Sequence, residues 1–181
     1  MGKTTVANYL ASAYQFPVLD ADVYAREAVR PGSAVLTKVV ERYGTEILLP
    51  DGMLDRRCLG NIIFENSQEQ RWLETQIHPY VRQCLQRELE PLKQDPVIVL
   101  VIPLLLEAQM TNFVTEIWVV SCSEAKQVER LMQRNSLTLK QAQTRIASQM
   151  PIAQKIAQAT VVLDNSSTPD ALLRQVDAVL K

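Results

Sequence analysis

Four short runs of consecutive apolar residues recur along the chain, separated by longer stretches with helical periodicity. They cover residues 16–19, 97–102, 117–120 and 160–163 and are rich in β-branched side chains. Because these runs are apolar throughout instead of alternating with polar residues, they favour strands that are buried on both faces of a parallel sheet. Strands that alternate with helices in this way predict an α/β fold with a doubly wound parallel sheet.

Polar residues just before the helical stretches indicate where helices begin. A hydroxyl side chain at such a position accepts a hydrogen bond from the first helical turn. We predict N-caps of this kind at Ser67, Ser123, Thr138 and Thr168. Gln70 and Gln141 follow Ser67 and Thr138 by three residues and predict two capping boxes.

Two polar helical regions interrupt the regular alternation of strands and helices. The crossover from the first strand to the second, about 23–94, is far longer than one helix, which predicts an inserted helical region that binds a substrate. Residues about 127–154 form two segments rich in Arg, Gln and Lys, which predict either a mobile helical lid or a solvated helix pair. With no linker or repeat in between, we expect a single domain over residues 1–181.

Composition narrows the class of protein. The 181 residues carry 19 Lys and Arg against 20 Asp and Glu, a net charge of -1. This balance does not indicate binding to nucleic acid or to an anionic membrane. The longest apolar stretch, residues 97–106, is half as long as a membrane-spanning helix and contains Pro103. Three scattered cysteines favour free thiols in a reducing compartment. We therefore expect a cytoplasmic protein without nucleic-acid or membrane partners.

The first five residues carry the most informative motif. Gly2-Lys3-Thr4 is the last third of a P-loop, and it leads directly into a helical pattern. In that loop the glycine lets the backbone curl around phosphates, the lysine reaches the β- and γ-phosphates, and the hydroxyl holds Mg²⁺. The helix adds its positive N-terminus. The motif therefore predicts ATP binding with Mg²⁺.

A second motif, Asp20-Ala21-Asp22, follows the first predicted strand. Ligands gather beyond the carboxyl ends of parallel strands, and an extended backbone would point both carboxylates to the same side. One carboxylate would accept a proton from an attacking hydroxyl, while the other would help to organise Mg²⁺. The alternative is that Asp20 or Asp22 only caps the next helix.

Seven stretches in order along the chain resemble the dephospho-CoA kinase family of P-loop enzymes. They are GKTTVANYLA, LDADVYAREAVRPG, YGTEILLPDGMLDRRCLGNIIF, WLETQIHPYV, VIVLVIPLLLE, VERLMQRNSLTLKQAQTRIASQ and VVLDNSS. The resemblance implies that ATP phosphorylates the 3′-hydroxyl of dephospho-CoA. Two alternatives remain: another small-molecule or nucleotide kinase on the same scaffold, or a non-catalytic protein that binds a nucleotide or CoA.

The resemblance also implies roles for individual residues. Lys3 and Asp22 would be catalytic, with Asp22 as the general base, and Thr4 and Asp20 would be the residues that face Mg²⁺. The residues implied to bind ATP are Met1, Gly2, Lys3, Thr4, Thr5, Arg134, Arg145 and Asn165. The residues implied to bind the acceptor are Asp22, Arg26, Arg56, His78, Pro103, Leu104 and Leu105.

Several of these residues have a structural alternative. Arg26, Arg56 and Arg145 are also compatible with ordinary surface positions, and His78 before Pro79 with a helix break. Glu107 is either a helix cap or the partner of an arginine. The first glycine of the P-loop and its preceding strand are absent from the printed chain, so we expect an in-frame start about ten to fifteen residues upstream.

Overall fold

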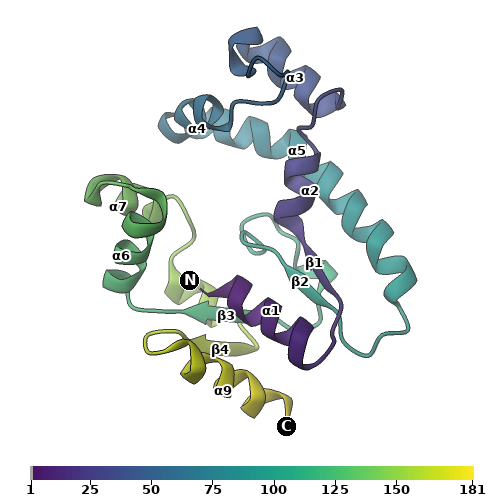
Figure 1. The fold of residues 1–181 in the computed structure, drawn as a ribbon, viewed down its shortest axis with the longest axis vertical. Coiled ribbons are helices and arrows are strands. Elements are labelled where there is room, and N and C mark those ends of the chain that lie inside the picture. The colour runs from purple at the N-terminus through teal and green to yellow at the C-terminus, as the bar shows by residue number, and fades with distance from the viewer. Residues whose placement is uncertain (1) are drawn as a thin grey trace. The chain divides into compact units, whose positions relative to one another are not determined.

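The computed structural model describes residues 2–181, except for the side chains of Phe64 and Glu65, and contains two compact units (Figure 1). The first unit comprises Met1–Val18 and Val99–Lys181, and the second comprises Leu19–Ile98. The second unit contains the helical insertion expected at about 23–94. That residues 1–181 act as a single kinase domain stays a prediction.

The first unit contains the strands and the helices around them. Its elements are α1 (Lys3–Ala13), the start of β1 (Val18–Asp20), β2 (Val99–Val101), a 3₁₀ turn (Thr111–Phe113), β3 (Trp118–Ser121), α6 (Glu124–Asn135), α7 (Leu139–Ala147), α8 (Ile152–Ala157), β4 (Val161–Asp164) and α9 (Pro169–Leu180). All four strands coincide with the predicted apolar runs to within two residues at each end, and the α/β class is confirmed.

The strands pair in two sets. β3 and β4 are parallel, with Trp118 opposite Val161 and Ser121 opposite Asp164. β1 and β2 form a second two-stranded sheet, and the N–H of Val99 donates to the carbonyl of Pro17 at 2.8 Å. The sequence suggested one doubly wound sheet, whereas the described strands pair only within these two sets. Three to four residues per strand leave few ladder bonds in each.

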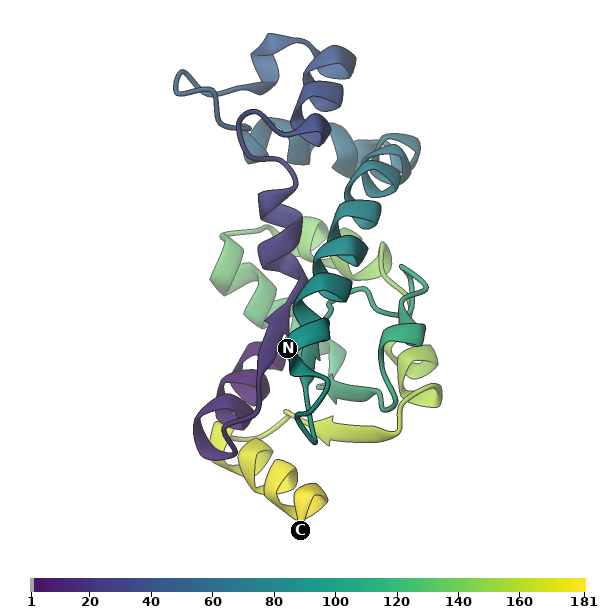
Figure 2. The same ribbon diagram turned by 90° about the vertical axis from the view of Figure 1, so that its right-hand side faces the viewer.

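Helices α1 and α9 lie side by side and share one hydrophobic core with β3 and β4 (Figures 1 and 2). That core consists of Val6, Leu10, Val120, Leu163, Leu172 and Val176. The hydroxyls of Tyr9 and Tyr14 both donate to Oδ1 of Asp177, at 2.7 and 2.8 Å. These two bonds fasten α1 to α9 and raise the pKa of both tyrosines.

The predicted polar hairpin is present as α6 and α7, with α8 after it (Figure 1). Ser123 caps α6, and Thr138 caps α7 in the predicted capping box with Gln141. Thr168 caps α9 as expected. Because each cap satisfies N–H groups of the first turn, the local sequence fixes where these three helices begin.

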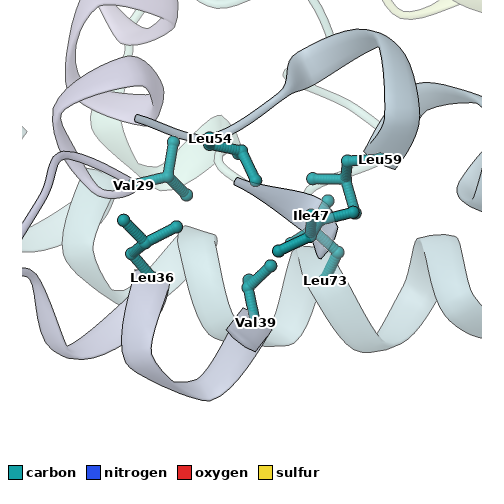
Figure 3. Close-up of a cluster of buried hydrophobic side chains, with 7 residues drawn as sticks. All are labelled: Val29, Leu36, Val39, Ile47, Leu54, Leu59 and Leu73. Atoms are coloured by element: carbon teal, nitrogen blue, oxygen red, sulfur yellow. The ribbon is translucent and has the colours of Figure 1, made fainter. Parts of the chain in front are cut away.

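The regular elements of the second unit are helical apart from the end of β1 and an isolated antiparallel bridge between Leu48 and Leu54. The helical elements are α2 (Ala21–Glu27), α3 (Ala34–Tyr43), a 3₁₀ turn (Thr45–Ile47), α4 (Arg56–Glu65), α5 (Ser67–Leu89) and a second 3₁₀ turn (Glu90–Leu92). α2 packs along α5 (Figure 2). Seven apolar side chains from α3, α4, α5 and the segments that precede α3 and α4 close a separate core (Figure 3): Val29, Leu36, Val39, Ile47, Leu54, Leu59 and Leu73.

For α5, the structure corrects one expectation, the N-cap, and excludes one alternative, the helix break at Pro79. The N-cap is Asn66 rather than Ser67, because the Asn66 side chain accepts from the N–H groups of Gln68 and Glu69 and leaves Ser67 as the first helical residue. Nor does Pro79 break the helix after His78. A proline removes one helical hydrogen bond, whereas residues on both sides of it, Leu73 and Leu85 among them, are buried. The burial of these side chains therefore stabilises the helix on both sides of Pro79.

An ion pair with aromatic neighbours fastens α3 to α5. Arg42 donates to both carboxylate oxygens of Glu69, at 2.6 and 2.8 Å, and the Tyr43 hydroxyl donates to the same carboxylate at 2.5 Å. The Arg42 guanidinium also lies 4.5 Å from the centre of the Trp72 ring, a cation–π distance. Bonds from Arg42 and Tyr43 lower the pKa of Glu69 from 4.5 to about 2.

This depressed pKa predicts an acid-dependent stability. A carboxyl group with a lower pKa in the folded chain stabilises the fold above its unfolded pKa, and that contribution is lost as pH falls toward the folded value. Glu69→Gln should therefore lower the urea midpoint of unfolding at neutral pH, and the difference from wild type should shrink between pH 4.5 and about 2. Glu41→Gln, an exposed change on the same helix as Arg42, serves as control. A difference that does not vary with pH would contradict the assignment.

No helix within residues 2–181 combines the length and the apolar character that a membrane crossing requires.

Candidate functional site

At the start of α1 the backbone lies close to side chains of other elements. Gly2 precedes the helix with a φ of 103°, a left-handed conformation that favours glycine. A Cβ at this position would collide with the side-chain amide of Asn165 and lie 3.3 Å from Leu172. Asn165, predicted to bind ATP, is 7% exposed and donates its N–H to the Ser121 carbonyl at 2.7 Å. It therefore packs against the loop glycine from the end of β4.

Lys3, Thr4 and Thr5 form the first turn of α1, where N–H groups lack helical partners. Lys3 is half-buried, and both threonines are exposed. A cation at a helix N-terminus is opposed by the helix dipole, so Lys3 is not explained by helix stability. Met1, also predicted to bind ATP, lies outside the described residues.

A cleft of about 650 Å³ is lined by residues from the start of α1 and from the α6–α7 hairpin. Four of its lining side chains are cationic, namely Lys3, Arg130, Arg134 and Arg145, and among the described residues that line it none is acidic. Gathering four like charges costs free energy unless an anion neutralises them. The structure thus brings Lys3, Arg134 and Arg145 together at one cleft from three helices.

Sequence reasoning missed Arg130 and Gln149 in this cleft. Arg130 precedes Arg134 by four residues on α6, whereas Gln149 lies two residues beyond the end of α7 and shares no helix with Arg145. Residues four apart on a helix share a face. The spacing was a usable signal, because once one arginine is assigned to the cleft its neighbour one turn away faces the same way.

In the second unit the aspartates differ from the extended arrangement expected for them. Asp20 ends β1 and caps α2, and its side chain accepts from the N–H of Asp22 at 2.9 Å. Ala21 and Asp22 are already helical, so the two carboxylates do not alternate along a strand. Asp22 is exposed in the first turn of α2, where the helix dipole stabilises a negative charge.

Arg26 and Arg56 come together in the second unit. Arg56 begins α4 and donates from Nη2 to the Arg26 carbonyl at 3.4 Å. Partial desolvation and the positive charge of Arg26 lower the pKa of Arg56. No ion pair in the described part of the chain involves either arginine, and the two residues place two positive charges near each other.

His78 and the 103–105 segment also have defined surroundings. His78 is half-buried on α5, where desolvation and Arg82 lower its pKa although Glu74 opposes them. Its imidazole is therefore neutral at pH 7. In the first unit Pro103, Leu104 and Leu105 follow β2 in a compact turn, with the N–H of Met110 bonded to Leu105 and that of Ala108 to Leu104.

A magnesium ion would need oxygen donors. The Thr4 hydroxyl and the Asp20 carboxylate are of the type that Mg²⁺ prefers, and Mg²⁺ usually takes one or two protein oxygens together with waters and phosphates. Among residues 2–181 no three His, Cys, Asp or Glu side chains gather as a metal cluster. Thr4 belongs to the first unit and Asp20 to the second, and each offers one oxygen of the type that Mg²⁺ bound with a nucleotide takes.

Comparison with known proteins gives a consistent result. Residues 1–170 match the family model for dephospho-CoA kinase. A dephospho-CoA kinase of Trichormus variabilis is 60% identical over 179 residues, which cover 99% of this chain and 91% of the relative. The crystal structure of TT1252 from Thermus thermophilus is similar with a TM-score of 0.79 and 34% identity, covering 99% of this chain and 90% of that one. Dephospho-CoA kinase from Campylobacter jejuni has a TM-score of 0.69 and 25% identity, again with 99% and 90% coverage.

Proposed function

The chain belongs to the dephospho-CoA kinase family, the kinases of the last step of coenzyme A biosynthesis, and from this premise we propose how its residues share the reaction. The γ-phosphoryl group of ATP passes to the 3′-hydroxyl of dephospho-CoA, giving ADP and CoA. The observation that carries the proposal is the cleft lined by Lys3 and three arginines without a carboxylate among its described lining residues.

The cleft suits a triphosphate in charge and in position. Lys3 contacts the β- and γ-phosphates, and the first turn of α1 adds backbone N–H donors. Arg134 and Arg145 neutralise the charge that spreads over the transferred group, an electrostatic contribution that is largest where water is excluded. Asn165 holds Gly2 in place and stands where the family binds adenine.

The positive charge of a Mg²⁺ ion bound with ATP would neutralise charge on the phosphates. Thr4 and Asp20 are the residues we assign to it. On the acceptor side, Asp22 takes the proton of the 3′-hydroxyl as the oxygen forms its bond to the γ-phosphorus and the bond to the β–γ bridging oxygen breaks. The proton stays on the Asp22 carboxyl group until product leaves.

The acceptor carries phosphates of its own, and Arg26 and Arg56 supply the positive charge to hold them. His78 with Pro103, Leu104 and Leu105 supplies a neutral surface for the rest of this bulky molecule.

A cytoplasmic location is supported by Cys58, Cys84 and Cys122, which are all free thiols.

The role of Arg56 predicts a change in affinity for the acceptor. A hydrogen bond to a charged group contributes about 1.5–3 kcal/mol, so Arg56→Ala should raise the KM for dephospho-CoA about ten- to a hundredfold. The KM for ATP should change little. Arg57→Ala, an exposed change next in the same helix, is the matched control. Equal effects of both variants, or an unchanged KM in Arg56→Ala, would contradict the assignment.

A direct assay separates this function from its alternatives. The protein is incubated with ATP and Mg²⁺ and with one acceptor at a time, either dephospho-CoA or a nucleoside monophosphate. We expect CoA and ADP in equal amounts from dephospho-CoA alone. Phosphorylation of another acceptor but not of dephospho-CoA would indicate a different kinase. CoA binding by calorimetry without turnover would indicate a non-catalytic binding protein.

A further inference from the structure

Glu107 makes contacts that the sequence did not indicate. Its Oε1 lies 2.6 Å from Nζ of Lys155 on α8 and accepts the N–H of Met150 at 3.1 Å. The sequence suggested a helix cap or an arginine partner, and the structure shows a lysine and a backbone N–H instead. Both partners come from the segment that follows α7, 43 or more positions along the chain.

The position of Glu107 is fixed on its own side. It lies in the turn after β2, closed by bonds from Ala108 to Leu104 and from Met110 to Leu105, at 2.8 and 2.9 Å. Ala108 is 9% exposed and Met110 is 2% exposed, so the turn is anchored in the interior. Glu107 is therefore a fixed point to which the end of the hairpin is attached.

The Glu107 carboxylate is ionised, and one of its two oxygens lowers the stability of the fold. Burial raises its pKa, but bonds from Lys155 and from the N–H groups of Glu107 and Met150 outweigh that effect and lower it. Oε2 is buried and has no hydrogen-bond partner among the described residues. A buried charged oxygen without such a partner costs stability, so folding alone does not account for this glutamate.

The residues that Glu107 contacts lie next to residues that line the cleft. Met150 directly follows Gln149, which lines the cleft, and Arg145 lies in the last turn of α7. Short bonds join these residues, from Gln149 to the carbonyl of Ile146 at 3.1 Å and from Ser148 to the carbonyl of Thr144 at 3.0 Å. Met150 is thus connected through Ser148 and Gln149 to the last turn of α7, from which Arg145 lines the cleft.

The other end of the hairpin is attached as well. Nζ of Lys126, in the first turn of α6, donates to the carbonyl of Ser166 after β4. Arg130 and Arg134 follow one and two turns further along α6. Both sides of the cleft are thus attached to the rest of the unit, and Glu107 provides an attachment on the side of Arg145.

We propose that Glu107 is a positioning residue, which holds the end of α7 through Met150 and Lys155 and so sets the place of Arg145 in the phosphate cleft. This inference rests on the proposed role of the cleft. A guanidinium acts on a developing charge only in the correct place, because displacements of about 1 Å at a reacting centre cost large factors in rate. Glu107 itself does not touch the substrates.

A double-mutant cycle tests this proposal. Glu107→Ala should lower kcat/KM for ATP about tenfold, and Glu107→Gln, which keeps an oxygen for the Met150 N–H, should lower it less. In an Arg145→Ala background, Glu107→Ala should have little further effect, because its action passes through Arg145. The KM for dephospho-CoA should not change.

The controls separate positioning from stability and from failure of the site itself. Tyr14→Phe weakens the contact between α1 and α9 away from the cleft, and should lower the melting temperature without changing the KM for ATP. If Arg145→Ala is silent, both the cleft assignment and this inference are overturned. If Arg145→Ala is impaired and Glu107→Ala adds its full effect on top, or has none alone, only the positioning role is overturned. Glu107→Gln decides the matter in the same way if the alanine variant does not fold.

Discussion

Asp22→Asn should lower turnover by about 10²–10⁴ while leaving the affinity for ATP nearly unchanged, because a positioned general base contributes about that much to a proton transfer. The amide has the shape of the carboxylate but cannot accept the proton of the ribose hydroxyl. Asp22 is exposed in the first turn of α2, so the change should leave the cores of both units intact. Initial rates of ADP formation at saturating substrates give the turnover, and calorimetry with ATP gives the affinity.

Asp51→Asn is the matched control for this experiment. Asp51 lies in an exposed turn of the same unit, where its carboxylate accepts the N–H of Met53 at 3.0 Å. An asparagine oxygen accepts that bond equally well, so turnover should remain at the wild-type level. Wild-type turnover in Asp22→Asn would remove Asp22 from the role of base and leave its position at the helix N-terminus as its explanation.

Lys3→Ala should lower turnover by about 10²–10³, the cost of removing one preorganised donor from a site that stabilises developing charge. It should not lower stability. Lys3 begins α1, where the dipole disfavours a cation, and three arginines share its cleft. We therefore expect an unchanged or higher melting temperature together with the loss of activity, which general destabilisation would not produce.

Lys140→Ala provides the comparison for Lys3. Lys140 lies on α7 of the same hairpin but is exposed and does not line the cleft. The same loss of positive charge there should leave turnover unchanged. Similar losses in both variants would mean that overall charge, instead of contact with phosphate, explains the effect of Lys3.

Local patterns predicted most of the elements but few of the contacts between them. The four apolar runs and the caps at Ser123, Thr138 and Thr168 each depend on residues within a few positions, and the structure contains all of them. Choices between neighbouring polar residues were less secure. Asn66 and Ser67 are both good caps, and only the direction of the chain into α5 decides between them.

The site depends on longer-range information. The start of α2 at Ala21 removed the alternation expected of Asp20 and Asp22, because a capping aspartate turns the backbone into a helix at once. The contact of Glu107 with Lys155 spans 48 positions and has no local pattern. By contrast, the P-loop fragment placed Lys3 at a helix start, and the hairpin brought Arg134 and Arg145 to the same cleft. Motifs identified the chemistry, while tertiary contacts determined which groups support it.

The two tryptophans of the chain can serve as fluorescence probes, one for the unfolding of each unit. Of the two tryptophans, Trp72 belongs to the helical unit and Trp118 to the unit that contains the paired strands β3 and β4. Trp72 lies under the Arg42 guanidinium, with Tyr43 edge-on at 5.6 Å. Replacing one indole by phenylalanine would leave a fluorescence signal from one unit alone. The two emission spectra would then reveal whether the units unfold together or in sequence, without any external label.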